Sequence, residues 1–217
     1  MSTEKMQMRT NARLVAKVLT KYRDTFYALK ELINNSLYAK ATRIDINFIP
    51  SECDEDSIHY HPIDRIQVFD NGYGVSYADF KKSIMEIATD NKSDGYGVGR
   101  FSALQIGRCM HISTTAYDEI SKQYTKTEVE FNIQQFQKDD LHNKEFDVKS
   151  YIIGSPHGTG YQVEISDLYT NDEKSERKNK LSKEFTKERF PQKLFESYPI
   201  YIFEGKVKFY FNGIELK

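Results

Sequence analysis

Apolar residues recur along the chain with two different periods, and the change of period predicts where helices and strands lie. From Phe26 to Leu37 they return every three or four positions, which predicts a helix with one buried stripe. From Arg43 to Phe48 apolar and polar residues alternate singly, which predicts a half-buried strand that ends at Pro50. Similar stretches predict further strands at 66–69, 110–117, 124–133, 146–153, 161–165, 200–203 and 207–211.

The order of these elements favours an α+β fold. Further helices are predicted at 77–88, at 100–106 and at 191–198, and Glu204 to Lys206 is a hairpin-length connection between the last two strands. Because helices come early and most strands come late, we expect a two-layer sandwich in which helices cover one face of a mostly antiparallel mixed sheet. No repeat or linker divides residues 1–217, so we expect a single domain.

Composition and charge exclude several classes of protein. Lys and Arg number 31 against 32 Asp and Glu, so no global field draws the chain to nucleic acid or to a membrane. Two cysteines, Cys53 and Cys109, do not make a disulfide framework. The N-terminus lacks the apolar segment of a signal peptide, and no apolar run reaches the roughly 18 residues of a membrane span. We therefore expect a cytoplasmic protein with no membrane partner.

The helix predicted after Phe26 carries an acid and an amide on one face. Glu31 and Asn35 are four residues apart, and Tyr38 falls on the same face, beside the buried stripe. Such a pair can bind a hydrated cation and orient a water molecule. Taken alone, it fits an exposed polar pair equally well.

Two glycine-rich stretches follow. Asp70 to Gly74 reads Asp-Asn-Gly-Tyr-Gly at the end of a predicted strand, which on its own indicates only a turn. Gly95, Gly97 and Gly99 precede a short predicted helix, where backbone amides can form an anion site. The chain contains no P-loop motif, and the glycine spacing differs from the dinucleotide fingerprint.

In combination, order and spacing these motifs resemble the GHKL ATPases, from about Ala28 to Ile200. The most specific pieces are Glu-Leu-Ile-Asn-Asn-Ser, Asp-Asn-Gly-Tyr-Gly-Val and Gly-Val-Gly-Arg-Phe-Ser-Ala-Leu. The sequence looks closest to the hydrolytic branch of Microrchidia, heat-shock chaperone-like and MutL-like proteins. The resemblance implies the Bergerat fold, binding of ATP or ADP with Mg²⁺, and ATP hydrolysis.

The resemblance also assigns roles to individual residues. Glu31 would be the general base that orients the attacking water, and Asn35 would be the metal ligand. The Asp70 carboxylate would accept a hydrogen bond from the adenine amine, and a lid at 89–97 would close over the nucleotide. The remaining cofactor-binding residues would be Gly72, Gly74, Lys92, Gly95, Gly97, Val98, Gly99, Arg100, Phe101 and Thr159. For Lys92, a solvated loop lysine is an equally good interpretation.

Some features depart from the family or stay open. Tyr38 stands where many members carry Asp, and Tyr73 is larger than the usual residue between the two glycines. Glu31 favours hydrolysis over phosphotransfer to histidine, and we expect slow turnover by this chain alone and a nucleotide-dependent homodimer of a longer protein. The alternative is a nucleotide-gated interaction module that does not hydrolyse ATP.

Two further clusters carry weaker hypotheses. The charged run from Glu173 to Arg189 is better explained as a solvated helix face than as a nucleic-acid contact. His59 and His61 lie two apart near Cys53, but no second ligand pair with metal-site spacing accompanies them.

Overall fold

The computed structural model describes residues 1–7, 22–51, 63–86, 99–135, 145–154 and 158–217. Its strands are β1 Ser2–Gln7, β2 Arg43–Pro50, β3 Ile63–Asp70, β4 Gly107–Asp118, β5 Gln123–Asn132, β6 Glu145–Ile153, β7 Gly160–Leu168, β8 Lys208–Phe211 and β9 Ile214–Glu215. Its helices are α2 Thr25–Tyr38, α3 Tyr77–Phe80, α4 Arg189–Ser197 and α5 Pro199–Phe203. A π-helical turn η1 Lys81–Met85 and 3₁₀ turns η2 Gly99–Gln105, η3 Ile133–Gln135, η5 Tyr169–Asn171 and η6 Arg177–Asn179 complete the described elements.

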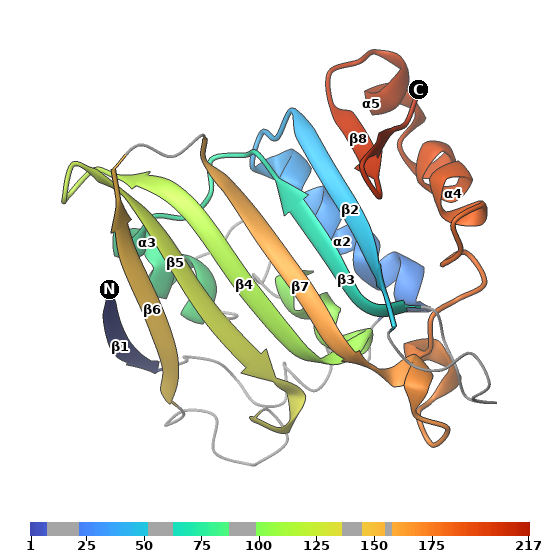
Figure 1. Cartoon of the computed structure of the whole chain (residues 1–217), viewed down its shortest axis with the longest axis horizontal. Coiled ribbons are helices and arrows are strands. Elements are labelled where there is room, and N and C mark those ends of the chain that lie inside the picture. Colours follow the sequence, from blue (N-terminus) through green and yellow to red (C-terminus); the bar gives the residue numbers. More distant parts are fainter. Residues whose placement is uncertain (8–21, 52–62, 87–98, 136–144, 155–157) are drawn as a thin grey trace.

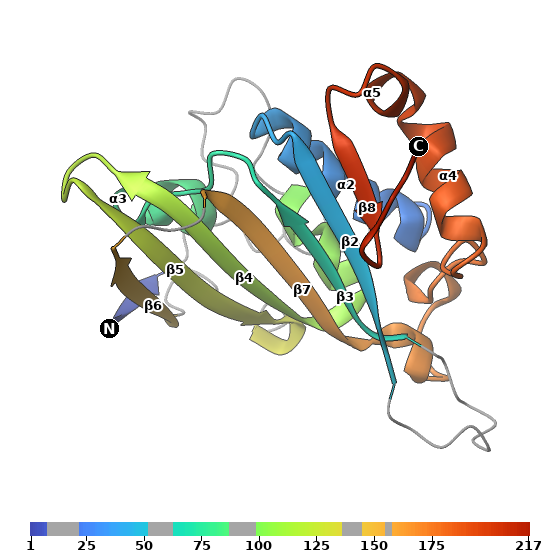
Figure 2. The same ribbon diagram turned by 45° about the horizontal axis from the view of Figure 1, so that its top comes forward.

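These nine strands form one sheet, in the order β1-β6-β5-β4-β7-β3-β2-β8-β9. β2 and β8 run parallel, whereas the other neighbouring pairs are antiparallel. α2, α3 and η2 lie on one face of the sheet, and the two ends of the chain lie toward its opposite edges (Figures 1 and 2). The predicted α+β class and the mostly antiparallel mixed sheet are therefore confirmed.

Helix α2 fills the centre of the covered face. The Asp24 carboxylate accepts hydrogen bonds from the amides of Phe26 (3.0 Å) and Tyr27 (3.1 Å), so the helix begins with a capped first turn. Its predicted apolar stripe is buried, apart from a partly buried Leu37. The stripe packs into a core that the sheet supplies through every second residue of its strands, among them Ile44, Ile46, Ile66, Val68, Met110, Ile112, Val163 and Ile165.

An aromatic cluster joins the end of the chain to α2. The ring of Phe190 in α4 lies 6.0 Å from that of Phe26, 4.7 Å from that of Phe48 and 5.1 Å from that of Phe211, measured between centroids. Phe190 itself is fully buried. The C-terminal helices are therefore part of the same core as the N-terminal helix.

The predicted strand at 200–203 is wrong, because these residues form helix α5. Pro199 occupies the first turn of that helix, where its fixed φ suits the helix and its missing amide hydrogen is not needed. Only Ile202 is buried, and a short apolar run does not distinguish a strand from a helix. The hairpin predicted at Glu204 to Lys206 is wrong too, because β8 pairs with β2 and β9 instead.

Two other predicted helices are shorter than expected or absent. Residues 77–85 form α3 and η1, and the backbone is extended at Glu86; the rest of the predicted helix lies outside the described residues. The charged run from Glu173 to Arg189 is not a helix face: up to the start of α4 it consists of turns, with one 3₁₀ turn at η6. The helix predicted at 191–198 is confirmed as α4.

Buried polar side chains bond the backbone of the charged run and hold it in a non-helical conformation. Gln105, which is fully buried, accepts a hydrogen bond from the Tyr22 amide (3.1 Å) and donates to the carbonyls of Tyr22 (2.9 Å) and Lys178 (3.4 Å). The Thr25 hydroxyl donates to the Lys180 carbonyl (3.2 Å) and accepts from the Ser182 amide (3.0 Å). The backbone of the run is thus bonded to the start of α2 and to η2.

We expect Gln105→Leu to destabilise the protein by about 2 kcal/mol, because it removes three hydrogen bonds of a fully buried side chain and keeps the side-chain volume similar. Urea unfolding followed by circular dichroism measures the change. Gln67→Leu is the matched control, since Gln67 is half-buried and, among the described residues, its side chain bonds Glu164 (2.6 Å). This substitution should cost less than about 0.5 kcal/mol. Equal losses in the two variants would contradict a tethering role for Gln105.

Candidate functional site

The acid and the amide of α2 lie beside the start of η2. Glu31 is half-buried and Asn35 is exposed, and they are one helical turn apart. A Cβ atom built on Gly99 would lie 3.2 Å from Glu31 Oε2 and 3.8 Å from Asn35 Oδ1. The Ser102 hydroxyl donates to the Ala28 carbonyl (2.7 Å), which fixes η2 against the helix. Stretches more than sixty residues apart therefore meet at one place.

Two tyrosines are electrostatically coupled to Glu31. Burial, together with the negative charge of Glu31, raises the pKa of Tyr22 to about 12. The same two causes raise the pKa of Tyr198, whose hydroxyl donates to Asn34 Oδ1 (2.9 Å). Both phenols are therefore protonated at neutral pH. Sequence reasoning missed them, because Tyr198 is reached only through the packing of the C-terminal helices.

Asp70 ends β3 at the other end of α2. Its side chain is buried, with 2% of its surface exposed. The Ser36 hydroxyl donates to Oδ2 (2.7 Å) and the Gly72 amide donates to Oδ1 (2.8 Å). Burial raises the pKa of Asp70, and these two hydrogen bonds oppose the shift. Ser36, which sequence reasoning did not single out, belongs to the same motif as Asn35.

The turn after Asp70 lies against the C-terminus of α2. The Tyr73 amide donates to the Ala39 carbonyl (3.1 Å), and a Cβ atom on Gly72 would lie 2.7 Å from that same oxygen. Gly74 has φ +66°, a conformation that favours glycine. Both glycines are thus required by close backbone approach. Tyr73 is 70% exposed.

Thr159 reaches this turn from the residues before β7. Its hydroxyl donates to the Gly72 carbonyl (2.6 Å) rather than to Asp70 itself. In the β3–β7 pairing Asp70 lies opposite Tyr161, two residues beyond Thr159. The structure thus brings Thr159 to the turn that follows Asp70 and gives its hydroxyl a defined partner, the Gly72 carbonyl.

Arg100 and Phe101 differ in their surroundings. Arg100 donates to the Glu86 carbonyl (3.2 Å), and burial lowers its pKa to about 10. The side chain of Phe101 is buried in the core, with its ring 5.2 Å from that of Phe131. A contact between Phe101 and phosphate would therefore involve its backbone amide only.

Several predicted residues lie outside the described part of the chain: Lys92, Gly95, Gly97 and Val98, the lid at 89–97, and the pair His59 and His61. Among the described residues, no group of three or more His, Cys, Asp or Glu side chains is arranged to hold a metal ion. Asn35 is the described oxygen ligand that the sequence predicts. No described helix is long and apolar enough to cross a membrane.

Comparisons with known proteins find a matching family and similar solved structures. The sequence model of a family described as histidine kinase-, DNA gyrase B- and HSP90-like ATPase matches residues 22–159. One similar solved structure is the Aquifex aeolicus MutL ATPase domain complexed with ADP, at 22% identity and a TM-score of 0.49, over 87% of this chain and 60% of that one. Another is the N-terminal domain of a DNA repair protein, at 19% identity and a TM-score of 0.53, over 92% and 51%.

The chain therefore spans between about half and three-fifths of the length of these two structures. A search of curated proteins finds no match. The second structural likeness supports the fold.

Proposed function

Because the chain belongs to the histidine kinase-, DNA gyrase B- and HSP90-like ATPase family, we propose that it binds ATP along α2, with the base at Asp70 and the phosphates at Gly99. The observation that carries the proposal is that three motifs meet on one helix. Gly99 lies beside Glu31 and Asn35, and Asp70 is bonded to Ser36 of that helix.

Asp70 is suited to recognise adenine. Each of its carboxylate oxygens accepts one hydrogen bond, from Ser36 and from Gly72, and so retains a lone pair. The exocyclic amine of adenine donates to such an oxygen, whereas guanine presents a carbonyl at the same position and would be repelled. Thr159 and the turn at Gly72 would complete the pocket for the base.

Asn35 is suited to hold Mg²⁺. Its exposed carboxamide supplies one neutral oxygen, and Mg²⁺ in nucleotide sites takes few protein ligands and completes its shell with phosphates and waters. When bound, the ion would neutralise phosphate charge. Glu31, one turn earlier, would orient the attacking water and accept its proton. The amides at the start of η2, from Gly99 to Phe101, would contact the phosphates.

We propose further that this ATPase acts within a longer protein, where the bound nucleotide controls dimerisation or docking. This part rests on the resemblance of its motifs to those of the hydrolytic branch. What the cycle would drive depends on the domains attached to it.

Titration calorimetry with ATP tests the proposal. We expect saturable one-to-one binding in Mg²⁺, weakened about tenfold or more when EDTA removes the metal. Asn35→Ala should bind ATP equally with and without Mg²⁺, whereas Asn34→Ala, on the neighbouring helix position, should keep the metal dependence. Absence of ATP binding by the wild-type chain would refute the proposed function.

A further inference from the structure

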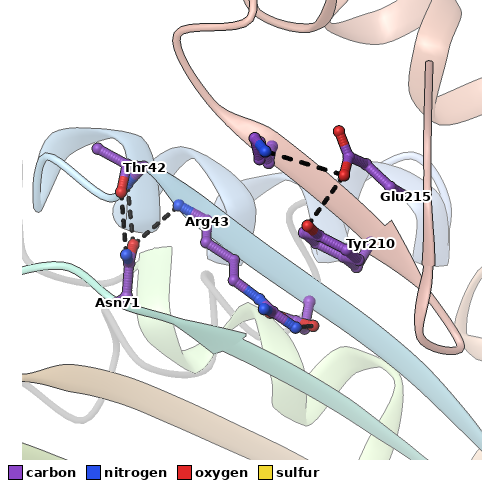
Figure 3. A network of polar contacts seen from close by, with 7 residues as sticks. Thr42, Arg43, Asn71, Tyr210 and Glu215 are labelled. Atoms are coloured by element: carbon purple, nitrogen blue, oxygen red, sulfur yellow. Dashed lines mark hydrogen bonds and ion pairs between the residues drawn. The ribbon is translucent and has the colours of Figure 1, made fainter. Parts of the chain in front are cut away.

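The carboxamide of Asn71 clamps the turn after Asp70 to the segment between α2 and β2. Its Oδ1 accepts hydrogen bonds from the amides of Thr42 (2.9 Å) and Arg43 (2.8 Å), and its Nδ2 donates to the Thr42 hydroxyl (2.9 Å). The Asn71 amide also donates to the Arg43 carbonyl (3.2 Å). Figure 3 shows the side chain reaching across to this segment. One exposed side chain thus makes three hydrogen bonds to two consecutive residues.

A residue with strained backbone lies just before Thr42 and Arg43, the two residues that Asn71 bonds. Lys40 has φ +59°, at a position after the helix where glycine is usual. Strained backbone of this kind persists when its surroundings hold it in place. The contacts on its two sides do so: Ala39 accepts from Tyr73, and Thr42 bonds Asn71.

Thr42 and Arg43 also contact β8, which forms the C-terminal hairpin with β9. The Lys208 amide donates to the Thr42 carbonyl (2.9 Å). The Arg43 guanidinium donates twice to Asp45 (2.7 and 2.8 Å) and lies 4.1 Å from the ring centroid of Tyr210. Arg43 and Tyr210 lie side by side in Figure 3. The Thr42–Arg43 segment is therefore anchored on the sheet, and Asn71 fixes the turn to that anchor.

We propose that Asn71 is a positioning residue for recognition of the base. By fixing the turn to Thr42 and Arg43, its carboxamide sets where the Gly72 amide, which donates to Asp70 Oδ1, stands relative to the face that carries Glu31 and Asn35. This inference rests on the proposed ATP site and concerns the distance between its base end and its phosphate end. Without the clamp, the turn keeps its glycines but no longer holds in one place the Gly72 amide, which donates to Asp70 Oδ1.

The test compares the affinities for ATP and GTP in matched variants by titration calorimetry. Asn71→Ala should weaken ATP about tenfold and leave GTP nearly unchanged, so the preference for ATP falls about tenfold. Asn71→Asp should restore the preference to within about threefold, because a carboxylate accepts from both amides and the Thr42 hydroxyl can donate to it. A merely structural role would not predict this rescue together with a change in base preference.

Asn212→Ala is the control for loss of stability. Its carboxamide also accepts from a β2 amide, that of Phe48 (2.8 Å), roughly 17 Å further along the strand. It should lower the thermal midpoint and leave the ratio of ATP to GTP affinity unchanged. An unchanged ratio in Asn71→Ala, with ATP still bound by the wild type, would overturn the role of Asn71 and leave the proposed function standing. A lower ratio of ATP to GTP affinity in both Asn71→Ala and Asn212→Ala would show that Asn71 has only a structural role.

Discussion

Asp70→Asn is expected to weaken ATP binding by roughly 100-fold or more while the protein stays folded. The substituted amide keeps the size of the side chain. Its oxygen can accept from the Gly72 amide, and its nitrogen can donate to Ser36. What it loses is the second acceptor, so an NH₂ group would face the adenine amine. Calorimetric titration with ATP measures the loss.

The free energy of unfolding of this variant, unlike its ATP affinity, should not fall. Burial raises the pKa of Asp70 above the value of the unfolded chain. A carboxyl group with a raised pKa in the folded state stabilises the protein fully below its unfolded pKa and loses that contribution as pH rises through the folded pKa. Asp70→Asn removes the titrating group and with it this loss of stability on raising the pH. We expect the free energy of unfolding of the variant to equal or exceed that of the wild type at pH 7.

Asp118→Asn is the matched control. Asp118 is 3% exposed and accepts hydrogen bonds from the amides of Ala78 (3.2 Å), Ile120 (2.9 Å) and Ser121 (3.1 Å), none of them in the Asp70 turn. Its amide variant should leave ATP affinity within about twofold of the wild type. Unchanged affinity in Asp70→Asn would mean that the base binds elsewhere.

Strands with strict alternation are the elements that sequence predicts best. β2 lies where apolar and polar residues alternate, because Ile44, Ile46 and Phe48 face the core and the residues between them are polar. β1 is not predicted from sequence, because only Met6 of its six residues is buried and its apolar and polar residues do not alternate. Its place comes from pairing with β6, which depends on backbone hydrogen bonds rather than side chains.

The residues of the candidate site also divide into those that can be named from sequence and those that cannot. Glu31, Asn35, Asp70 and Gly99 can be named from sequence, because their motifs in combination resemble those of the GHKL ATPases. The residues that pack around them cannot be named from sequence, since Gln105 bonds Tyr22, 83 residues away, and Tyr198 bonds Asn34, 164 residues away. Asn71 belongs to a motif, but its contacts with Thr42, 29 residues away, can be found only in the folded structure.

Glu31→Ala is expected to lower ATP hydrolysis by roughly 10² to 10⁴-fold and to change ATP affinity by less than about threefold. The carboxylate would act on the attacking water, whereas the nucleotide would be held by Asp70, Asn35 and the amides of η2. Phosphate release under saturating ATP measures the first quantity and calorimetric titration the second. For the wild-type chain alone we expect turnover below about 1 s⁻¹, in keeping with the proposal that it acts within a longer protein.

Glu31→Gln separates proton transfer from packing beside Gly99. Its side chain keeps the shape of Glu31 at the 3.2 Å approach to the Gly99 Cβ position, but it is a far weaker base. It should hydrolyse as slowly as Glu31→Ala and bind ATP as tightly as the wild type. Hydrolysis retained in Glu31→Gln would show that the residue serves geometry rather than chemistry. If wild type and both variants bind ATP and none hydrolyses it, even in the longer protein, the chain is a nucleotide-gated interaction module, and Glu31 shapes the site without acting as a base.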